Sequence, residues 1–207
     1  VTVNMSTVEP GNDLAKSIFK PNDYCILTSA TLRTNLSFDY FLNRVGLNSF
    51  EFDDISSKVF ESPFSYSDQV TYYQYSGNDG QRPDIIAKTI LHCHKKFNKR
   101  MMVLFTSRAQ LDNTHQILKQ ISRSEHLPIF AQKRQTSRLG LIRGMGQVSN
   151  GILLGTNAFW EGVDLPGDLL EILIIIKMPF DVPTEPTVKA YGSMGEAQGG
   201  NSFRDYA

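Results

Sequence analysis

The sequence predicts an α/β protein with a mainly parallel sheet and helices on both faces. Short apolar runs alternate with longer amphipathic runs, which is the pattern of repeated strand–helix–strand units. The short runs are continuously apolar, as in strands that are covered on both faces. The chain has 207 residues, of which 41% are hydrophobic and 20% charged, so it can form one such domain or a domain with part of a second.

Five apolar runs are predicted to be strands. They are Tyr24–Thr28, Met101–Thr106, Leu127–Ala131, Gly151–Gly155 and Glu171–Met178. Residues 57–75 are rich in β-branched and aromatic side chains, which favours further extended structure at a sheet edge. Residues 77–83 combine glycine, asparagine, aspartate and proline, so we expect a turn there.

Three amphipathic helices are predicted between these strands. One helical stripe in residues 84–97 holds Ile85, Ile86, Thr89, Ile90, Cys93 and Phe97. Residues 108–122 and 135–148 repeat the helical spacing of apolar residues and carry several basic side chains. A helix after a strand can cross back over the sheet, as parallel pairing requires. A change in composition at residues 46–49 is the one internal boundary that the sequence suggests.

Charge is balanced overall, with 21 basic and 21 acidic residues, but it is uneven along the chain. Residues 88–143 hold 12 Lys and Arg against two acidic residues, a local excess of ten. This excess is compatible with a phosphate-binding surface and equally with solvated helix faces. The two cysteines, Cys25 and Cys93, are too few for a four-cysteine cluster. No apolar run approaches the roughly 20 residues of a membrane span, so we expect a cytoplasmic protein with no membrane partner.

Two segments place hydroxyl groups directly after predicted strands, where a parallel sheet binds its ligands. LTSATL at residues 27–32 contains Ser29 and Thr31, which suit a ligand crevice but also form turns and helix caps. LFTSRAQ at residues 104–110 contains Thr106, Ser107 and Arg108 at a predicted helix start. These residues could hold a phosphate or simply cap the helix.

A third segment, GTNAFWEGVDLPG at residues 155–167, predicts a shaped site more strongly. It joins three glycines, a proline and the only tryptophan with two carboxylates beside a strand end. Glu161 and Asp164 could bind a metal-bound water, a ribose or an arginine of a partner lobe. The sequence contains no G-x-x-x-x-G-K-[ST] phosphate loop and no DEAH-like acidic run, so it lacks the usual grip on a nucleotide and its magnesium. His92 and His94 diverge on a helix and do not favour a metal site.

In this order, the three segments resemble motifs III, IV and V of the DinG/XPD-like helicases of superfamily 2, and most closely those of bacterial DinG-like proteins. The run IIIKMPFDVPTEP at residues 174–186 resembles the family's stretch between motifs V and VI. The resemblance covers most of the chain, least clearly residues 58–99. It implies the end of a first motor lobe over residues 1–47 and a second RecA-like lobe over residues 48–207.

The same resemblance implies that parts of the motor lie outside this sequence. Walker A and Walker B of the first lobe are absent, as is the four-cysteine cluster of some members, and the chain stops at Ala207 just before motif VI. The chain also lacks an initiating methionine. We therefore expect a fragment with no ATPase activity of its own, taken from an ATP-dependent DNA helicase.

The resemblance also implies roles for individual residues. Ser29 and Thr31 would couple nucleotide state to DNA binding. Glu161 and Asp164 would line the cleft between the two lobes, facing the nucleotide or its sensing arginines on one side and DNA on the other, with Gly162 and Gly167 at the cofactor. The residues expected to contact nucleic acid, from the resemblance and from the basic excess, are Thr106, Ser107, Arg108, Trp160, Lys133, Arg134, Arg138 and Arg143. ATP and Mg²⁺ would be held mainly by the first lobe, and the partners would be that lobe and single-stranded DNA.

Two other functions stay open at this point. Some DinG-like proteins resemble fusions to an exonuclease domain, so the lobe could serve nucleic-acid binding or regulation in a nuclease. A doubly wound domain of another class, such as a flavodoxin-like domain, could bind a small ligand and no nucleic acid. Salt-dependent binding of a single-stranded oligonucleotide separates the small-ligand domain from the other two, and the protein's N-terminal part separates helicase from nuclease.

Overall fold

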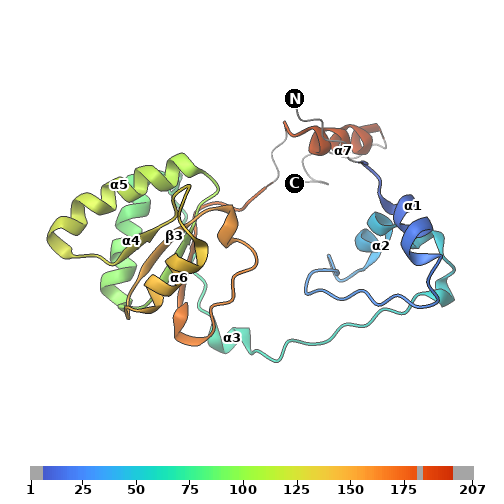
Figure 1. Ribbon diagram of the computed structural model, residues 1–207, viewed down its shortest axis with the longest axis horizontal. Coiled ribbons are helices and arrows are strands. Elements are labelled where there is room, and N and C mark those ends of the chain that lie inside the picture. The colour runs from blue at the N-terminus through green and yellow to red at the C-terminus, as the bar shows by residue number, and fades with distance from the viewer. Residues whose placement is uncertain (1–6, 181–183, 198–207) are drawn as a thin grey trace. The chain divides into compact units, whose positions relative to one another are not determined.

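The computed structural model describes residues 7–180 and 184–197, and the chain divides into two compact units. Unit 1 comprises residues 1–71 and 181–207, and unit 2 comprises residues 72–180. Figure 1 shows the order of the elements along the chain. All strands of the described sheet belong to unit 2, so the predicted fold class is tested by the structure of that unit.

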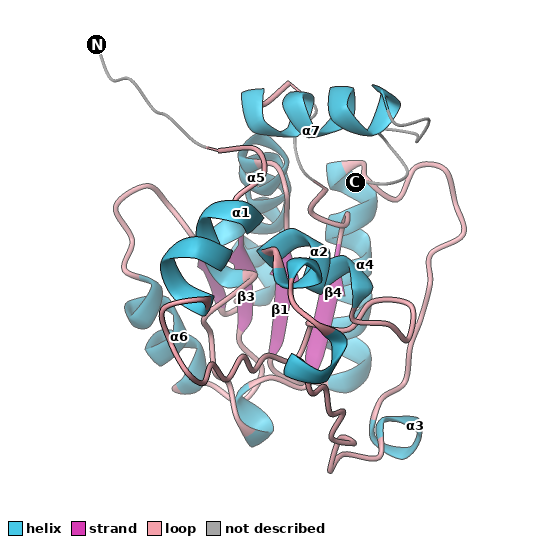
Figure 2. Cartoon of the chain, turned by 90° about the vertical axis from the view of Figure 1, so that its right-hand side faces the viewer, coloured by secondary structure: helices cyan, strands magenta, loops and turns pink. Residues whose placement is uncertain are grey.

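Unit 2 is built on a four-stranded parallel sheet with the strand order β2-β3-β1-β4. The strands are β1 (Met101–Leu104), β2 (Ile129–Ala131), β3 (Ile152–Gly155) and β4 (Ile172–Ile175). β1 pairs with β3 and with β4, and these three strands lie side by side in Figure 2. Four of the five predicted strands are therefore confirmed, each shorter than its apolar run.

Helices cover both faces of this sheet. Since alternate residues of a strand point to opposite faces, Met101 and Val103 of β1 join one apolar cluster and Met102 and Leu104 join another. The first cluster includes buried residues of α4 (Pro83–Phe97) and α5 (Arg108–Glu125), and the second includes those of α6 (Arg138–Gly146). The predicted α/β class, with helices on both faces of a parallel sheet, is confirmed.

The three helices follow the sequence prediction with local corrections. α4 buries Ile86, Ala87 and Ile90, whereas Thr89 and Phe97 of the predicted stripe are exposed, because only the row that faces the sheet and α5 is covered. α6 starts at Arg138 and not at residue 135. Its start is set by the Ser137 side chain, whose Oγ accepts a hydrogen bond from the Gly140 amide at 3.4 Å.

The strand predicted at residues 24–28 is wrong for the chain as described. These residues form no strand, and the side chains of Tyr24 and Ile26 are 92% and 93% exposed. A strand needs a neighbouring strand for its backbone hydrogen bonds, and residues 7–71 and 184–197 of unit 1 contain none. The apolar pattern indicated that these residues are suited to burial, but it carried no information about what would cover them.

The prediction of extended structure at a sheet edge in residues 57–75 is also wrong. The regular element in this segment is the short helix α3 (Tyr66–Gln69), and the aromatic side chains of Phe60, Tyr72 and Tyr73 are largely exposed. Aromatic and β-branched composition favours a strand only where a neighbour accepts the pairing. The edges of the sheet are β2 and β4, and neither pairs with this segment. The turn predicted at residues 77–83 is confirmed.

Unit 1 consists of short helices. These are α1 (Gly11–Leu14), which continues as a π-helical turn (Ala15–Phe19), α2 (Asp39–Val45), two 3₁₀ turns (Leu47–Ser49 and Phe52–Asp54), α3 and α7 (Pro186–Ala197). The rings of Phe19 and Phe50 pack edge to face with their centroids 6.4 Å apart. The units divide after residue 71, whereas the predicted lobe boundary lies after residue 47. The units are defined by contacts within this chain, whereas the lobes are defined by the family resemblance. The lobe boundary therefore stays a prediction.

Candidate nucleic-acid and nucleotide interface

The carboxyl ends of β1, β2 and β3 bring three polar segments to one edge of the sheet, here called the carboxyl edge. Thr106 follows β1, Gln132 follows β2 and Thr156 follows β3. Leu104 and Gly155 lie opposite each other in the register of β1 and β3. The segment that resembles motif IV (residues 104–111) and the loop that resembles motif V (residues 155–167) therefore begin at adjacent positions, at the edge where parallel sheets bind ligands.

Hydrogen bonds connect these segments across the carboxyl edge. The indole Nε1 of Trp160 donates to the carbonyl oxygen of Phe105 at 3.5 Å, which joins the motif V-like loop to the motif IV-like segment. The side-chain Oε1 of Gln132 accepts from the amide and the hydroxyl of Thr156, at 2.8 and 3.0 Å. Gln132 was not among the predicted site residues, although it is a polar residue directly after a strand and the same signal could have identified it.

The start of α5 is capped by its own side chain. Ser107 Oγ accepts a hydrogen bond from the Gln110 amide at 3.4 Å, so one of the donors that a phosphate could use is already engaged. Arg108 Nε donates to Asp112 Oδ2 at 3.1 Å, one turn along the helix. This pair is partly exposed and therefore weak, so it leaves the guanidinium able to exchange partners. Capping is thus present, and phosphate binding by Thr106, Ser107 and Arg108 stays a prediction.

The backbone of the motif V-like loop is held by packing and by one arginine. A Cβ at Gly155 would lie 2.7 Å from the ring of Phe159, which is buried, so a side chain at position 155 would displace that ring. Arg138 Nη1 donates to the carbonyl oxygens of Ala158 at 3.0 Å and of Glu161 at 3.4 Å. These contacts fix the first half of the loop against β3 and α6.

The predicted nucleotide-facing residues follow this anchored stretch. Gly162 has φ +68° and Gly167 has φ +60°, both in the left-handed region that favours glycine. The side chains of Glu161 and Asp164 are exposed. The chain therefore presents Glu161 from the anchored half of the loop and Asp164 from the half that follows it. Their contact with a nucleotide or with a partner lobe stays a prediction.

Arg138 was predicted to bind nucleic acid, and in the structure its guanidinium holds the backbone of the motif V-like loop. Replacing Arg138 by alanine is expected to speed amide hydrogen exchange in residues 158–163 about tenfold, since two hydrogen bonds from a charged donor are lost locally. Exchange measured by mass spectrometry checks this. Arg143→Ala, on the exposed side of the same helix, is the matched control and should leave the loop unchanged. Equal exchange in the Arg138 variant and the unaltered chain would show that the guanidinium does not hold the loop.

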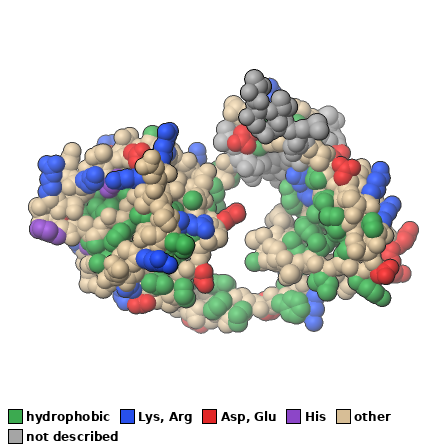
Figure 3. All heavy atoms as spheres, viewed as in Figure 1, with side chains coloured by type: hydrophobic (Ala, Val, Ile, Leu, Met, Phe, Trp, Pro, Cys, Tyr) green, Lys and Arg blue, Asp and Glu red, His purple; other side chains and the backbone are tan. Residues whose placement is uncertain are grey.

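The basic residues of positions 88–143 separate into different roles in the structure. Lys95 pairs with Glu125 at 2.7 Å and Lys99 with Glu171 at 2.8 Å, while the Arg100 side chain is mostly buried. Figure 3 shows Lys and Arg side chains spread over the visible face of unit 2. Of the predicted nucleic-acid contacts, Lys133 and Arg134 are exposed on the loop directly after β2, and Arg143 is exposed in the second half of α6.

Ser29 and Thr31 form a local turn in unit 1. The Thr31 amide donates to Ser29 Oγ at 3.2 Å, and the two hydroxyl oxygens are 3.3 Å apart. Both residues are exposed. Turn formation, which the sequence left open as an alternative, is thus observed, and the coupling role implied by the resemblance stays a prediction.

Several expectations concern metals, membranes and the end of the chain. Among residues 7–180 and 184–197, no three His, Cys, Asp or Glu side chains are grouped to hold a metal ion, and Cys25 and Cys93 are free thiols. None of the helices in these ranges has the length and hydropathy to cross a bilayer. Residues 181–183 of the run that resembles the motif V–VI stretch, and the end at Ala207, lie outside the described residues.

Residues 90–207 match the family model of the helicase C-terminal domain. This match covers more than half of the chain, so the chain belongs to the helicase C-terminal domain family. Within that family it is similar to DinG proteins, and the predicted DinG-like character is confirmed.

Two curated relatives and one solved structure illustrate the similarity. The chain is 34% identical over 212 residues to the 3'-5' exonuclease DinG of Bacillus subtilis, covering 99% of this chain and 22% of the relative. It is 31% identical over 208 residues to the ATP-dependent DNA helicase DinG of Photobacterium profundum, covering 97% and 30%. A solved XPD helicase aligns with a TM-score of 0.42 and 17% identity, over 58% of this chain and 21% of that one. The chain thus spans less than a third of the length of either curated relative.

Proposed function

We propose that this chain is the second motor lobe, with the closing part of the first, of a DinG-type ATP-dependent DNA helicase. The observation that supports this most directly is the hydrogen bond from Trp160 to Phe105, because it joins the motif IV-like segment to the motif V-like loop at the carboxyl edge. One connected edge thereby carries hydroxyl groups suited to a phosphate backbone and carboxylates suited to a partner lobe.

The residues of this chain suit the periphery of a nucleotide site and not the loop that binds the phosphates. The sequence has no phosphate loop, while Glu161 and Asp164 are exposed on a loop that is anchored as far as Glu161. Bound between this lobe and the first, ATP with Mg²⁺ supplies the free energy of the cycle, and the first lobe provides most of the contacts. The present chain would be inactive alone.

In the proposed cycle each lobe grips the strand in turn. Thr106 and Ser107 bind the phosphate backbone of a single strand, with Arg108 and Trp160 beside them. Ser29 and Thr31 couple the state of the bound nucleotide to the binding of the strand. Alternate closing and opening of the two lobes then moves the protein along the strand and separates a duplex. A cytoplasmic location and a role in DNA repair belong to the same proposal.

An exonuclease is the second candidate, because the Bacillus subtilis relative is named a 3'-5' exonuclease. In such a protein the lobe would bind or position the single strand while a separate domain cuts it. The two candidates share the DNA-binding edge and differ outside this sequence. An intact phosphate loop in the N-terminal part favours the helicase, and an acidic exonuclease signature there favours the nuclease.

Binding of single-stranded DNA tests the part common to both candidates. We expect the chain to bind a fluorescent oligothymidylate with an affinity that falls with salt, the log–log slope being about −0.7 for each phosphate contacted. Arg134→Glu and Arg143→Glu should each flatten this slope by about 0.7, since each removes one such contact. Lys88→Glu on α4 is a control with the same charge change. No binding at low salt would contradict the proposal, and unchanged slopes would remove the two arginines from the interface.

A further inference from the structure

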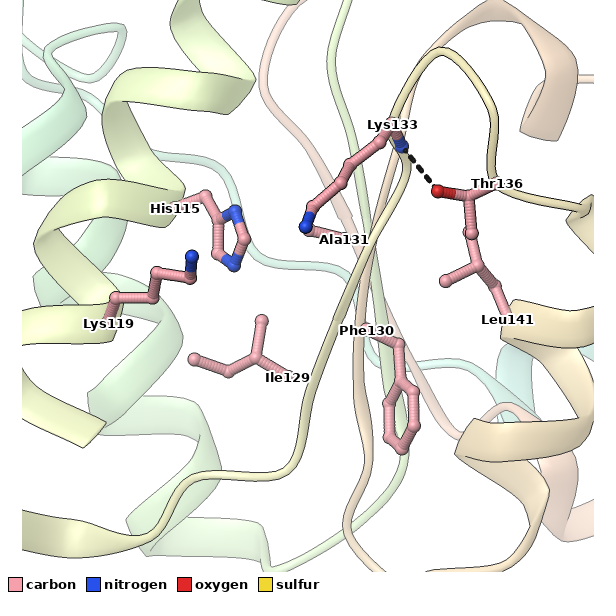
Figure 4. A pocket seen from close by; sticks show the side chains of 8 residues that line it. All are labelled: His115, Lys119, Ile129, Phe130, Ala131, Lys133, Thr136 and Leu141. Atoms are coloured by element: carbon pink, nitrogen blue, oxygen red, sulfur yellow. Dashed lines mark hydrogen bonds between the residues drawn. The ribbon is translucent and has the colours of Figure 1, made fainter. Parts of the chain in front are cut away.

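A shallow depression of about 320 Å³ lies beside the edge strand β2. Its floor is apolar and is formed by β2 residues and Leu141. Its polar lining consists of His115, Lys119, Lys133 and Thr136, and Figure 4 shows both lysine ammonium groups directed towards the His115 ring. None of the residues that line the depression is acidic.

The basic groups come from two elements that the fold brings together. His115 and Lys119 are one turn apart on α5, so they share a helix face. Lys133 lies on the loop after β2, and that loop is closed by a hydrogen bond from the Lys133 amide to Thr136 Oγ1 at 3.2 Å. Because β2 is an edge strand, no further strand covers this side of the sheet in unit 2. Two lysines and the His115 imidazole therefore lie over an open apolar floor.

The electrostatic balance of the depression favours an anion. Burial, followed by the charges of Lys119 and Lys133, lowers the pKa of His115, and Arg108 adds to this effect. The opposing charge is Asp112, which is already bonded to Arg108. The positive charges of Lys119 and Lys133 both act on His115, and an anion placed beside them relieves their mutual repulsion.

We propose that this depression binds a phosphate group. The phosphate is assigned to the backbone of the single strand that is held at the carboxyl edge, and this assignment rests on the proposed function. The neighbouring residue Gln132 supports this continuity, because it is bonded to Thr156 at the start of the motif V-like loop. The strand would thus extend from the carboxyl edge over the side of β2, where a lysine or protonated histidine gives a charge-assisted hydrogen bond to phosphate.

Phosphate binding at this place is coupled to protonation of His115. A bound phosphate stabilises the imidazolium, so the pKa of His115 is higher in the complex than in the free chain. The affinity for single-stranded DNA should therefore increase as the pH falls from 8 to 6. It should level off at the pH where His115 is protonated both in the free chain and in the complex. In His115→Gln the affinity should lose this part of its pH dependence.

Nuclear magnetic resonance of the His115 imidazole tests the site with inorganic phosphate as the probe. Phosphate is expected to shift the His115 resonance and to raise its pKa in the unaltered chain. Lys119→Ala and Lys133→Ala should each weaken this response about fivefold, in line with the loss of one charged contact. Lys88→Ala on α4 removes the same charge elsewhere and should leave it unchanged. A His115 resonance that phosphate does not move would overturn the proposal.

Oligothymidylate and ATP, tested separately, identify the source of the phosphate. We expect the oligonucleotide to shift His115 and its affinity to fall about fivefold in Lys119→Ala, with a salt slope flatter by about 0.7. A response to ATP alone, or oligonucleotide affinity unchanged in His115→Gln and Lys119→Ala, would overturn the assignment to the strand. If inorganic phosphate still moved His115 but the chain bound no oligonucleotide, the proposed function would fail while the phosphate site stood.

Discussion

Replacing Arg100 by alanine is expected to lower the free energy of unfolding by about 3 kcal/mol. The Arg100 side chain is only 13% exposed and lies at the amino edge of the sheet. Its Nε donates to Val148 O at 2.7 Å, its Nη2 to Gly146 O at 3.1 Å and its Nη1 to Asp168 O at 2.9 Å. One guanidinium thus joins the end of α6 to the segments before β3 and β4, and its loss leaves partly buried carbonyl oxygens without a donor.

Urea unfolding followed by circular dichroism measures this effect as a lower midpoint with an unchanged slope. Asp168→Ala should cost much less, because that carboxylate is 80% exposed and solvent screens its side of the 3.0 Å ion pair with Arg100. Arg82→Ala is the matched control, since Arg82 pairs with Asp84 on the surface. If the Arg100 variant unfolded at the same urea concentration as the unaltered chain, the carbonyl contacts would contribute nothing to stability.

Glu161→Gln in the whole protein is expected to reduce ATP turnover roughly 100-fold while single-strand affinity is retained. The backbone carbonyl of Glu161 accepts from Arg138, whereas its carboxylate is exposed. An amide of the same size therefore leaves the loop in place and removes only the charge. Because the proposed role of Glu161 is at the nucleotide site, the loss should appear in turnover and not in DNA binding.

Steady-state ATP hydrolysis with saturating single-stranded DNA gives the turnover, and fluorescence anisotropy gives the affinity. Glu171→Gln makes the same chemical change at the amino end of β4, where Glu171 pairs with Lys99, and should keep normal turnover. Normal turnover in Glu161→Gln would show that the motif V role does not belong to this residue. A parallel loss of DNA affinity would place the carboxylate at the strand and not at the nucleotide.

The strand predictions show which part of the fold a local pattern determines. β1, β3 and β4 arise from continuous apolar runs that the sheet buries or partly covers. Residues 24–28 have a similar run and form no strand, because a strand is stable only when a neighbour accepts its backbone hydrogen bonds. Composition records suitability for burial, whereas pairing depends on which segments the whole chain brings together.

The basic residues show the same limit for the candidate site. The sequence identified a local excess of charge, but it could not distinguish Arg100, which holds backbone carbonyls at the amino edge, from Lys133, which faces a depression beside β2. Arg138 was expected to bind DNA and is bonded to the motif V-like loop. His115 and Gln132 were not singled out, because their importance comes from neighbours far away in the sequence.

The α/β class, the order of the strands and helices in unit 2 and the family resemblance could be predicted from the sequence, since apolar periodicity and short motifs are properties of local segments. Tertiary structure was needed to establish the strand order β2-β3-β1-β4, the bond between Trp160 and Phe105, and the grouping of two lysines with His115 beside β2. These features depend on the distance between residues that the sequence separates, and that distance is set by packing of the helices on the two faces of the sheet.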